Sequence, residues 1–204
     1  MAERSDASWE EDFEKCVDFH GHACPGLALG YRAGKAALAS LGEGRGPDEE
    51  IVAIVETDAC GSDAIQVLTG CTFGKGNFFY KDYGKHAFSL FSRASGKGVR
   101  LSQKAGAFVL SERHRALFDR MRTKEATKEE LNDFWQLHRE KCREVLEASL
   151  DDLFSLQEVS MTLPPRANVA DSRPCDACGE PVMATKLVER NGKSLCRACI
   201  EKEG

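Results

Sequence analysis

The sequence lacks any hydrophobic run long enough to cross a membrane. A membrane-spanning helix needs about 20 apolar residues in a row, and apolar stretches such as Ile51 to Val55 are far shorter. The start of the chain, MAERSDASWEEDFEK, also lacks the apolar core of an export signal. We therefore expect a cytoplasmic protein that has no membrane partner.

Internal repeats, low-complexity tracts and an excess of positive charge are also missing. The 204 residues are 42% hydrophobic and 30% charged, which is typical of a soluble globular chain. The formal net charge of −5 disfavours broad electrostatic attraction to nucleic acid. We expect small molecules or proteins, rather than nucleic acid, as binding partners.

Cysteine, in contrast, is abundant, and the last four cysteines have the spacing of a zinc site. Nine cysteines in a chain without an export signal indicate metal or redox chemistry rather than a disulfide framework. Two Cys-x-x-Cys pairs, separated by residues 179–195, predict one structural Zn²⁺ bound by four thiolates, from Cys175, Cys178, Cys196 and Cys199. Asn191-Gly192 between them favours a tight hairpin turn, as in a zinc ribbon or treble clef.

Proline and small polar residues mark a boundary before this zinc site. The segment MTLPPRANVADSRP interrupts every periodic pattern, so we interpret residues 161–174 as a linker. Residues 1–160 then form a core domain, and residues 175–204 form a four-cysteine zinc finger. A finger of this size buries little apolar surface, so the metal is expected to supply most of its folding free energy, about 10 kcal/mol.

Hydrophobic periodicity in the core domain predicts a mixture of helices and strands. We expect helices over 9–19, 25–41, 63–69, 112–121 and 128–150, and strands over 50–56, 77–80, 86–92 and 97–102. This order indicates an α+β fold. Gly26, Gly30 and Gly34 form a smooth stripe on the second helix, which we interpret as a surface for tight helix packing.

Two turns of the core domain combine histidine and cysteine. In FHGHACPG, an extended chain would place His20, His22 and Cys24 on one side, and Pro25 would begin the next helix. After the strand IVAIVE, Cys60 also precedes a helix. A thiol at a helix N-terminus has a lowered pKa, which suits a metal ligand or a nucleophile.

Cys71, just beyond the helix stop at Gly70, completes a set of two imidazoles and three thiols. These donors suit Zn²⁺ and other divalent transition metals, so we predict a second metal in the core, held by residues drawn from His20, His22, Cys24, Cys60 and Cys71. His20 and Cys60 are its first candidates. A binuclear site, a redox dithiol, and ordinary buried cysteines beside turn histidines remain alternatives.

The segment GCTFGKGNFF does not meet the requirements of a phosphate-binding loop. Such a loop needs four residues between its glycines and Ser or Thr after its lysine, whereas Gly76 follows Lys75 here. We interpret it as a glycine-rich loop that brings backbone close to a ligand or metal.

Three blocks, FHGHACPGLALGYRAG, ETDACGSDAIQVLTGCTFGKGN and DYGKHAF, resemble the E-subunit family of formylmethanofuran dehydrogenase. The resemblance spans about 13–150, with the blocks in the same order. It implies a dimeric, metal-binding α+β core that is often followed by a cysteine zinc finger. The implied metal residues are His20 and Cys60, with His22, Cys24 and Cys71 as further candidates.

The family takes its name from a molybdenum or tungsten enzyme that reduces carbon dioxide to a formyl group. The resemblance thus implies partners among the subunits of such an oxidoreductase. No segment resembles a molybdopterin-binding or iron–sulfur sequence, so we do not expect this chain to perform the redox step itself. Whether the chain is an enzyme in its own right stays open.

Three functions therefore compete. The first is a metal-binding protein accessory to a formylmethanofuran or formate-type dehydrogenase. Its catalytic version would use Cys24 or Cys60 as thiolate and Asp58 or Glu56 as proton acceptor. The second is an inert dimeric platform whose zinc finger docks on protein or nucleic acid. The third is a thiol redox sensor that uses Cys60 and Cys71.

Overall fold

The computed structural model describes residues 10–167 and 170–202, and the chain divides into two compact units between Arg166 and Ala167. Strand β6 (Ser172–Pro174) takes up the last three residues of the predicted linker, so regular structure resumes before Cys175. Trp9, the first residue of the predicted N-terminal helix, lies outside the described residues. Across the described ranges, no helix combines the length and the apolar character of a membrane span.

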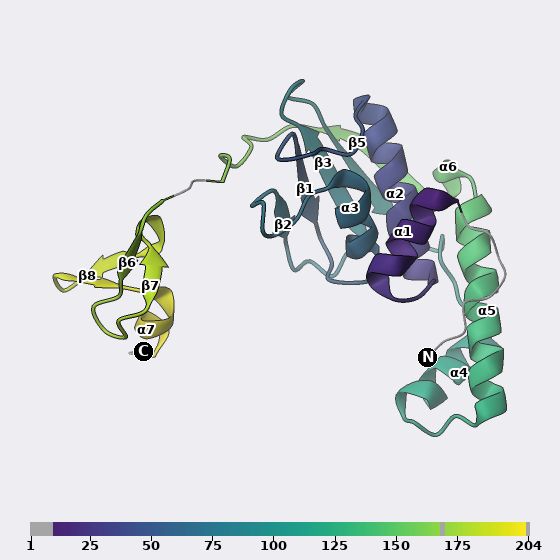
Figure 1. Ribbon diagram of the computed structural model, residues 1–204. Coiled ribbons are helices and arrows are strands. Elements are labelled where there is room, and N and C mark those ends of the chain that lie inside the picture. Colours follow the sequence, from purple (N-terminus) through teal and green to yellow (C-terminus); the bar gives the residue numbers. More distant parts are fainter. Residues whose placement is uncertain (1–9, 168–169, 203–204) are drawn as a thin grey trace. The chain divides into compact units, whose positions relative to one another are not determined.

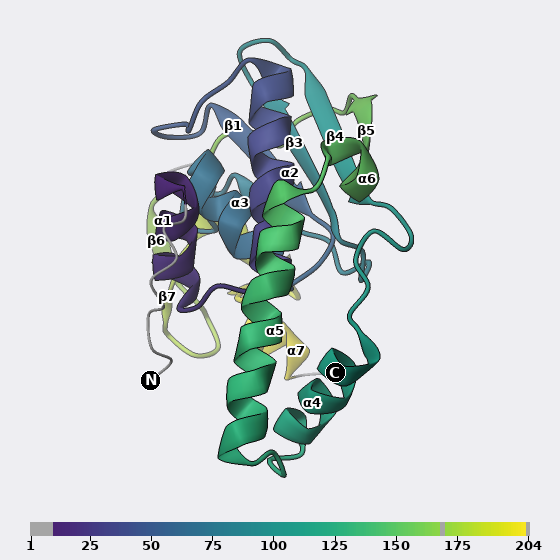
Figure 2. The ribbon, with the colours of Figure 1, turned by 90° about the vertical axis from the view of Figure 1, so that its right-hand side faces the viewer.

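The larger unit is built on a five-stranded mixed sheet (Figure 2). Its order is β2-β1-β3-β4-β5, with β1 parallel to β2 and every other pair antiparallel. The strands are β1 (Ile51–Val55), β2 (Phe78–Tyr80), β3 (Ala87–Ser92), β4 (Gly98–Gln103) and β5 (Phe154–Val159). Together with the helices, this sheet confirms the α+β class.

Strand β5 and the short helix before it, α6 (Leu150–Leu153), were not predicted. The preceding helix α5 (Lys128–Glu147) ends three residues earlier than expected. In the segment FSLQEV only Phe154 is fully buried, because β5 is an edge strand with much of its surface in solvent. A half-polar edge strand gives too little hydrophobic alternation to be recognised.

Helices α1 (Glu11–His20), α2 (Pro25–Leu41) and α3 (Gly61–Thr69) lie together on one face of the sheet (Figure 1). Ile51, Ala53 and Val55 of β1 point into this helical layer. Val52 and Ile54 alternate to the opposite face, where they pack with Phe91 and Leu163. Strand β1 is therefore buried on both sides, as its continuous apolar run predicts.

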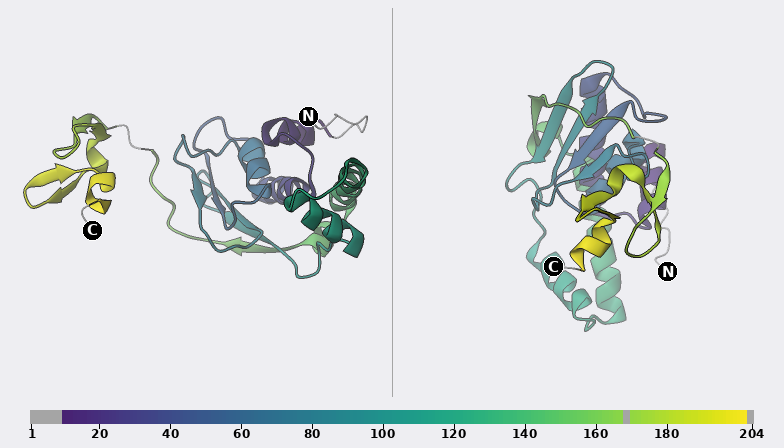
Figure 3. Two further views of the ribbon diagram at one scale, coloured as in Figure 1. Left: turned by 90° about the horizontal axis from the view of Figure 1, so that it is seen from below. Right: turned by 90° about the vertical axis from the view of Figure 1, so that its left-hand side faces the viewer.

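The remaining helices form an antiparallel hairpin of α4 (Glu112–Arg122) and α5 (Figure 3). Helix α5 packs against α2, and α4 packs against α5. The hairpin encloses His114, whose Nε2 lies 3.0 Å from Nδ1 of His138, beside the ring of Phe134. The hydrogen bond between the two imidazoles gives each ring a polar partner inside an aromatic cluster. We therefore assign the pair a structural role.

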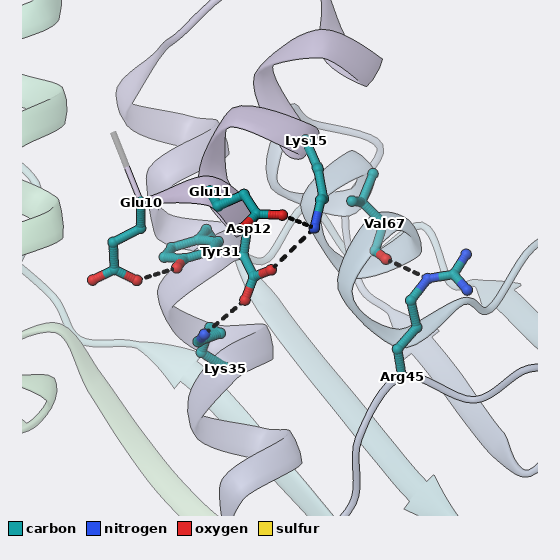
Figure 4. Close-up of polar contacts among 8 residues, drawn as sticks. All are labelled: Glu10, Glu11, Asp12, Lys15, Tyr31, Lys35, Arg45 and Val67. Carbon is teal, nitrogen blue, oxygen red and sulfur yellow. Dashed lines mark hydrogen bonds and ion pairs between the residues drawn. The ribbon is translucent and has the colours of Figure 1, made fainter. Parts of the chain in front are cut away.

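Helix α1 is anchored to α2 along its first turns, as Figure 4 shows. The fully buried ring of Phe13 meets the ring of Tyr31 edge-on at 5.2 Å. Tyr31 donates a hydrogen bond to Glu10 at 2.6 Å, and Lys35 binds Asp12 at 3.0 Å. Since exposed ion pairs contribute little, burial of Phe13 and of Cys16, the two buried side chains of α1, contributes most to this attachment. This attachment of α1 holds its last residue, His20, in place.

Helices α2 and α3 cross at a glycine–glycine contact. A Cβ added to Gly30 would lie 2.2 Å from the carbonyl oxygen of Gly61, closer than any real contact. The next glycine of the stripe, Gly34, faces Leu68 and Ile65 of α3. The predicted role of the stripe in tight helix packing is therefore confirmed.

We predict that Gly30→Ala destabilises the larger unit by about 3 kcal/mol or more, because backbone rather than a side chain must move. Gly34→Ala is the matched control. Its Cβ would meet the flexible end of Leu68 at 2.8 Å, and alanine favours the helix by up to about 1 kcal/mol. Urea denaturation measures both changes. Equal stability of the two variants would contradict the proposed crossing.

Candidate metal centres

A helix–turn–helix corner brings His20 and Cys24 together. His20 is the last residue of α1, and Gly21 caps the helix with φ of 95°, a left-handed conformation that glycine adopts readily. Cys24 is then extended, and Pro25 begins α2. The Sγ atom of Cys24 accepts a hydrogen bond from the backbone N–H of Leu27 at 3.3 Å and so caps α2.

The third member of the cluster comes from the start of α3. Cys60 is the residue before Gly61, and the crossing of α2 and α3 places its side chain beside Gly26 and Cys24. One ligand atom each from His20, Cys24 and Cys60 lies within 4.8 Å of the others. The Sγ atom of Cys24 is 3.8 Å from Nε2 of His20. We call these three residues the core cluster.

Asp63, in the first turn of α3, orients the imidazole of the core cluster. Its Oδ2 lies 2.7 Å from Nδ1 of His20. A carboxylate at this position accepts a hydrogen bond from Nδ1–H, which favours the tautomer whose lone pair is on Nε2, the nitrogen that faces Cys24. The Oδ1 atom of Asp63 also accepts a hydrogen bond from Gln66. Spacing alone cannot reveal the contact of Asp63 with His20, because the two residues are 43 positions apart in the sequence.

The two thiols of the core cluster share a proton unequally. The pKa of Cys60 is lowered to about 6, chiefly by a hydrogen bond from the Cys24 thiol and then by the nearby imidazole of His20. That same hydrogen bond, together with burial, raises the pKa of Cys24. The two shifts are opposite in direction, so Cys60 is the more readily deprotonated of the two thiols.

His22 does not join the core cluster, because the corner is not extended as the sequence suggested. His20 ends a helix, so the alternation expected for His20, His22 and Cys24 is wrong. The ring of His22 instead lies 4.6 Å from the ring of His20 and 5.8 Å from that of Trp135. Burial lowers the pKa of the His22 imidazole, and the nearby ring of His20 lowers it further.

Cys71 is also outside the core cluster, because it follows the far end of α3. The nine residues of α3 separate it from Cys60 by about 13 Å along the helix axis. Its thiol is fully buried and donates to the carbonyl of Ile51 at 3.3 Å. Cys71 thus has the structural role of a buried cysteine, and a Cys60–Cys71 redox pair is excluded by this distance.

Two other sequence candidates have structural partners. Glu56 forms a two-pronged ion pair with Arg100, at 2.7 and 2.9 Å, and this contact lowers the pKa of its carboxyl group. Glu56 is therefore not a free proton acceptor. In the glycine-rich loop, Lys75 donates to the carbonyls of Pro47 and Gly70 at 3.0 Å each, so it stabilises the loop.

The smaller unit contains the second cluster. Sulfur atoms of Cys175, Cys178, Cys196 and Cys199 lie within 4.8 Å of one another. Backbone N–H groups of Cys178 and Cys196 point at the sulfur of Cys175 and lower its pKa to about 6. Such N–H donors stabilise a metal-bound thiolate. We call this group the finger cluster.

Short elements frame the finger cluster. Strand β7 (Pro181–Met183) pairs with β6, and η1 (Ala184–Lys186) follows it. Strands β8 (Val188–Arg190) and β9 (Lys193–Leu195) form the predicted hairpin, and Asn191 and Gly192 both have positive φ. Cys196 precedes α7 (Arg197–Glu201), which carries Cys199. Among residues 170–202, only Leu195 and two of the cysteines are buried, so a bound metal would be the main source of stability of the unit.

The fold and the two clusters define a class: a metal-binding α+β protein with a C-terminal four-cysteine zinc finger. Residues 19–155 match the family described as FmdE, molybdenum formylmethanofuran dehydrogenase operon. Residues 170–203 match the prokaryotic dksA/traR C4-type zinc finger. The chain belongs to the FmdE family, in agreement with the resemblance noted from its sequence.

Two individual relatives agree with this assignment. A solved structure of a tungsten formylmethanofuran dehydrogenase FmdE-like protein from Syntrophus aciditrophicus superposes with a TM-score of 0.61 at 26% identity, and it covers 99% of this chain and 98% of that one. A probable S-adenosyl-L-methionine-binding protein of Archaeoglobus fulgidus is 33% identical over 195 residues, 91% of this chain. This chain spans about half (51%) of that relative.

We predict that removal of metal unfolds the smaller unit and leaves the secondary structure of the larger unit in place. The five-stranded core has its own apolar interior, whereas the finger cluster is the main link within residues 170–202. Amide hydrogen exchange before and after chelation, read separately over 10–166 and 170–202, measures this. Loss of protection in both ranges together would contradict it.

Cys196→Ser supplies the matched control without a chelator. It removes one finger thiolate, so it should abolish protection over 170–202 only. Cys71→Ser is the comparison, since Cys71 belongs to neither cluster and serine can keep its hydrogen bond to Ile51.

Proposed function

We propose that the core cluster binds one transition metal ion, Zn²⁺ in the first place, in addition to the zinc of the finger. Its donors are two thiols and one imidazole, the combination that borderline metals such as zinc prefer. Three protein ligands leave a fourth position of a tetrahedral ion open to water or a small molecule. The observation that carries the proposal is the convergence of Nε2 of His20 with the sulfurs of Cys24 and Cys60.

The dimensions and the surroundings of the cluster support a tetrahedral ion. Zinc–sulfur bonds of about 2.3 Å and zinc–nitrogen bonds of about 2.0 Å place neighbouring ligand atoms about 3.5 to 3.8 Å apart. The separation between Cys24 and His20 is 3.8 Å. The bond from His20 to Asp63 supplies the carboxylate–histidine arrangement that fixes many zinc-bound imidazoles.

A metal at this place would act as a Lewis acid on a small molecule in the open position. The thiolates of Cys24 and Cys60 would be ligands, and Asp63 would hold the imidazole in its tautomer. With Glu56 engaged by Arg100, exposed Asp58 remains the carboxylate of this loop that could accept a proton. The smallest role consistent with the cluster is metal binding.

At the level of the cell, we propose a cytoplasmic homodimer that is accessory to a molybdenum or tungsten dehydrogenase of the formylmethanofuran or formate type. Membership of the FmdE family and likeness to the tungsten formylmethanofuran dehydrogenase FmdE-like protein support this role. No segment of the sequence resembles a molybdopterin-binding or iron–sulfur sequence. The redox step would then belong to a partner protein.

We predict about two metal ions per chain in wild-type protein purified without added metal, and about one in the double variant His20→Ala, Cys60→Ala. Elemental analysis, with protein concentration from amino-acid analysis, gives the ratio. A ratio of one in both proteins would overturn the core metal and leave a platform whose zinc finger docks on a partner.

Asp63→Asn tests whether Asp63 positions His20 without binding the metal itself. It keeps the size of the side chain but weakens its hold on His20, so we expect core affinity for Zn²⁺ to fall about 10- to 100-fold, with the finger metal retained. Competition with a chromophoric chelator measures this affinity. Asp12→Asn, which touches only the exposed ion pairs of Asp12 with Lys35 and Lys15, is the matched control and should leave affinity unchanged.

A second candidate function is binding of S-adenosyl-L-methionine, because the relative from Archaeoglobus fulgidus carries that name at 33% identity. The likeness covers 91% of this chain but only about half of the relative, so the binding residues could lie in either half. Calorimetric titration of S-adenosyl-L-methionine into the metal-loaded protein distinguishes this candidate function from metal binding alone. We expect no saturable heat; saturable binding that survives in the His20→Ala, Cys60→Ala variant would favour this candidate.

A further inference from the structure

We infer that Cys24 and Cys60 form a reversible disulfide when the core cluster lacks metal, with hydrogen peroxide as the oxidant. The disulfide itself does not depend on the proposed core metal. Its consequence, the exchange between metal and disulfide that would regulate the core metal site, does rest on that proposal. The pairing differs from the Cys60–Cys71 pair that the sequence suggested.

Geometry selects this pair among the cysteines of the larger unit. The sulfurs of Cys24 and Cys60 belong to a group of ligand atoms that all lie within 4.8 Å of one another. Neither Cys71 nor Cys142 belongs to that group. The thiol of Cys142 is directed at the carbonyl oxygen of Cys24, at 3.7 Å, and Cys71 is bound to Ile51.

The surrounding backbone also leaves room for the bond. Beside the pair is Gly26, whose missing Cβ would be 3.4 Å from the Cβ of Cys60 and 4.0 Å from the Sγ of Cys24. Both cysteines are in the residue before a helix, so small rotations of the two side chains need not disturb the interior of α2 or α3. A disulfide needs an S–S bond of about 2.0 Å, so the two side chains must turn to bring together sulfurs that now lie within 4.8 Å of each other.

Exposure determines the order of the two steps. Cys60 is half-buried, whereas Cys24 is 3% exposed, so the oxidant reaches Cys60 first. The sulfur of Cys60 attacks one oxygen of the peroxide, the O–O bond breaks, and one water leaves, which makes the sulfenic acid. The sulfur of Cys24 then attacks the sulfur of Cys60 and expels a second water. Two thiols and one peroxide give one disulfide and two waters.

The consequence for the core cluster is a competition between metal and disulfide. A disulfide engages the sulfurs of two of the three ligands and leaves His20 alone, which is too few donors to hold zinc. A bound metal, in turn, occupies both sulfurs and protects them. A dithiol reductant restores the pair by thiol–disulfide exchange.

The test is peptide mapping of the full chain after treatment with hydrogen peroxide, alkylation of the remaining thiols and digestion with trypsin. Cys24 lies in the tryptic peptide 16–32 and Cys60 in the peptide 46–75. In chelator-treated protein we expect these two peptides to become linked, each with the loss of one free thiol, and to separate on reduction. In protein preloaded with Zn²⁺ and freed of excess metal, the link should form more slowly.

Each peptide contains a second cysteine, Cys16 or Cys71, so control variants assign the bond. The link should persist in Cys16→Ser and Cys71→Ser and disappear in Cys24→Ser and Cys60→Ser. A link that persists in Cys60→Ser, or oxidation of Cys60 beyond the sulfenic acid with no link in the wild type, would overturn the disulfide.

Metal content measured before oxidation separates this proposal from the function proposed above. If the reduced wild type holds one metal ion but the link still forms, the core metal fails and the disulfide stands. If the reduced protein holds two ions and no link forms after chelation, the disulfide fails and the core metal stands. Equal rates of linking with and without Zn²⁺ would overturn the competition between metal and disulfide.

Discussion

The backbone contact between Gly30 and Gly61 is the constraint on which the larger unit depends. A Cβ on Gly30 would meet the carbonyl oxygen of Gly61 at 2.2 Å, so only glycine permits this crossing of α2 and α3. Each helix begins just after a cysteine, Cys24 or Cys60. Because the helices cross near these ends, two thiols and two helix N-termini converge on one point. The dipoles of both helices favour negative charge there.

The other parts of the core cluster are arranged around this crossing. Burial of Phe13 against Tyr31 fixes α1, so that its last residue, His20, faces the two thiols. Asp63 is in the first turn of α3 and therefore moves with Cys60 when it orients His20. The finger cluster needs no such scaffold, because its four cysteines lie within about 25 residues of chain and the metal itself links them.

Sequence reasoning succeeded where the signal was local. The spacing of the four finger cysteines, the Asn191-Gly192 turn and the buried strand β1 all give patterns that short segments determine. It failed where the outcome depends on contacts between distant segments. Cys71 and His22 have the same chemistry as the true members of the core cluster, but helix length and the end of α1 at His20 set them apart. Asp63 gives no local signal in the sequence, since its contact with His20 arises from packing.

Anomalous diffraction at the zinc absorption edge would show directly whether His20, Cys24 and Cys60 jointly hold a metal ion. Crystals of the full chain, grown without added metal, should give two anomalous peaks per chain. One should lie within about 2.0 to 2.3 Å of Nε2 of His20 and the sulfurs of Cys24 and Cys60, and the other among the four finger cysteines. A single peak, confined to the finger with the three core residues well ordered, would contradict the account.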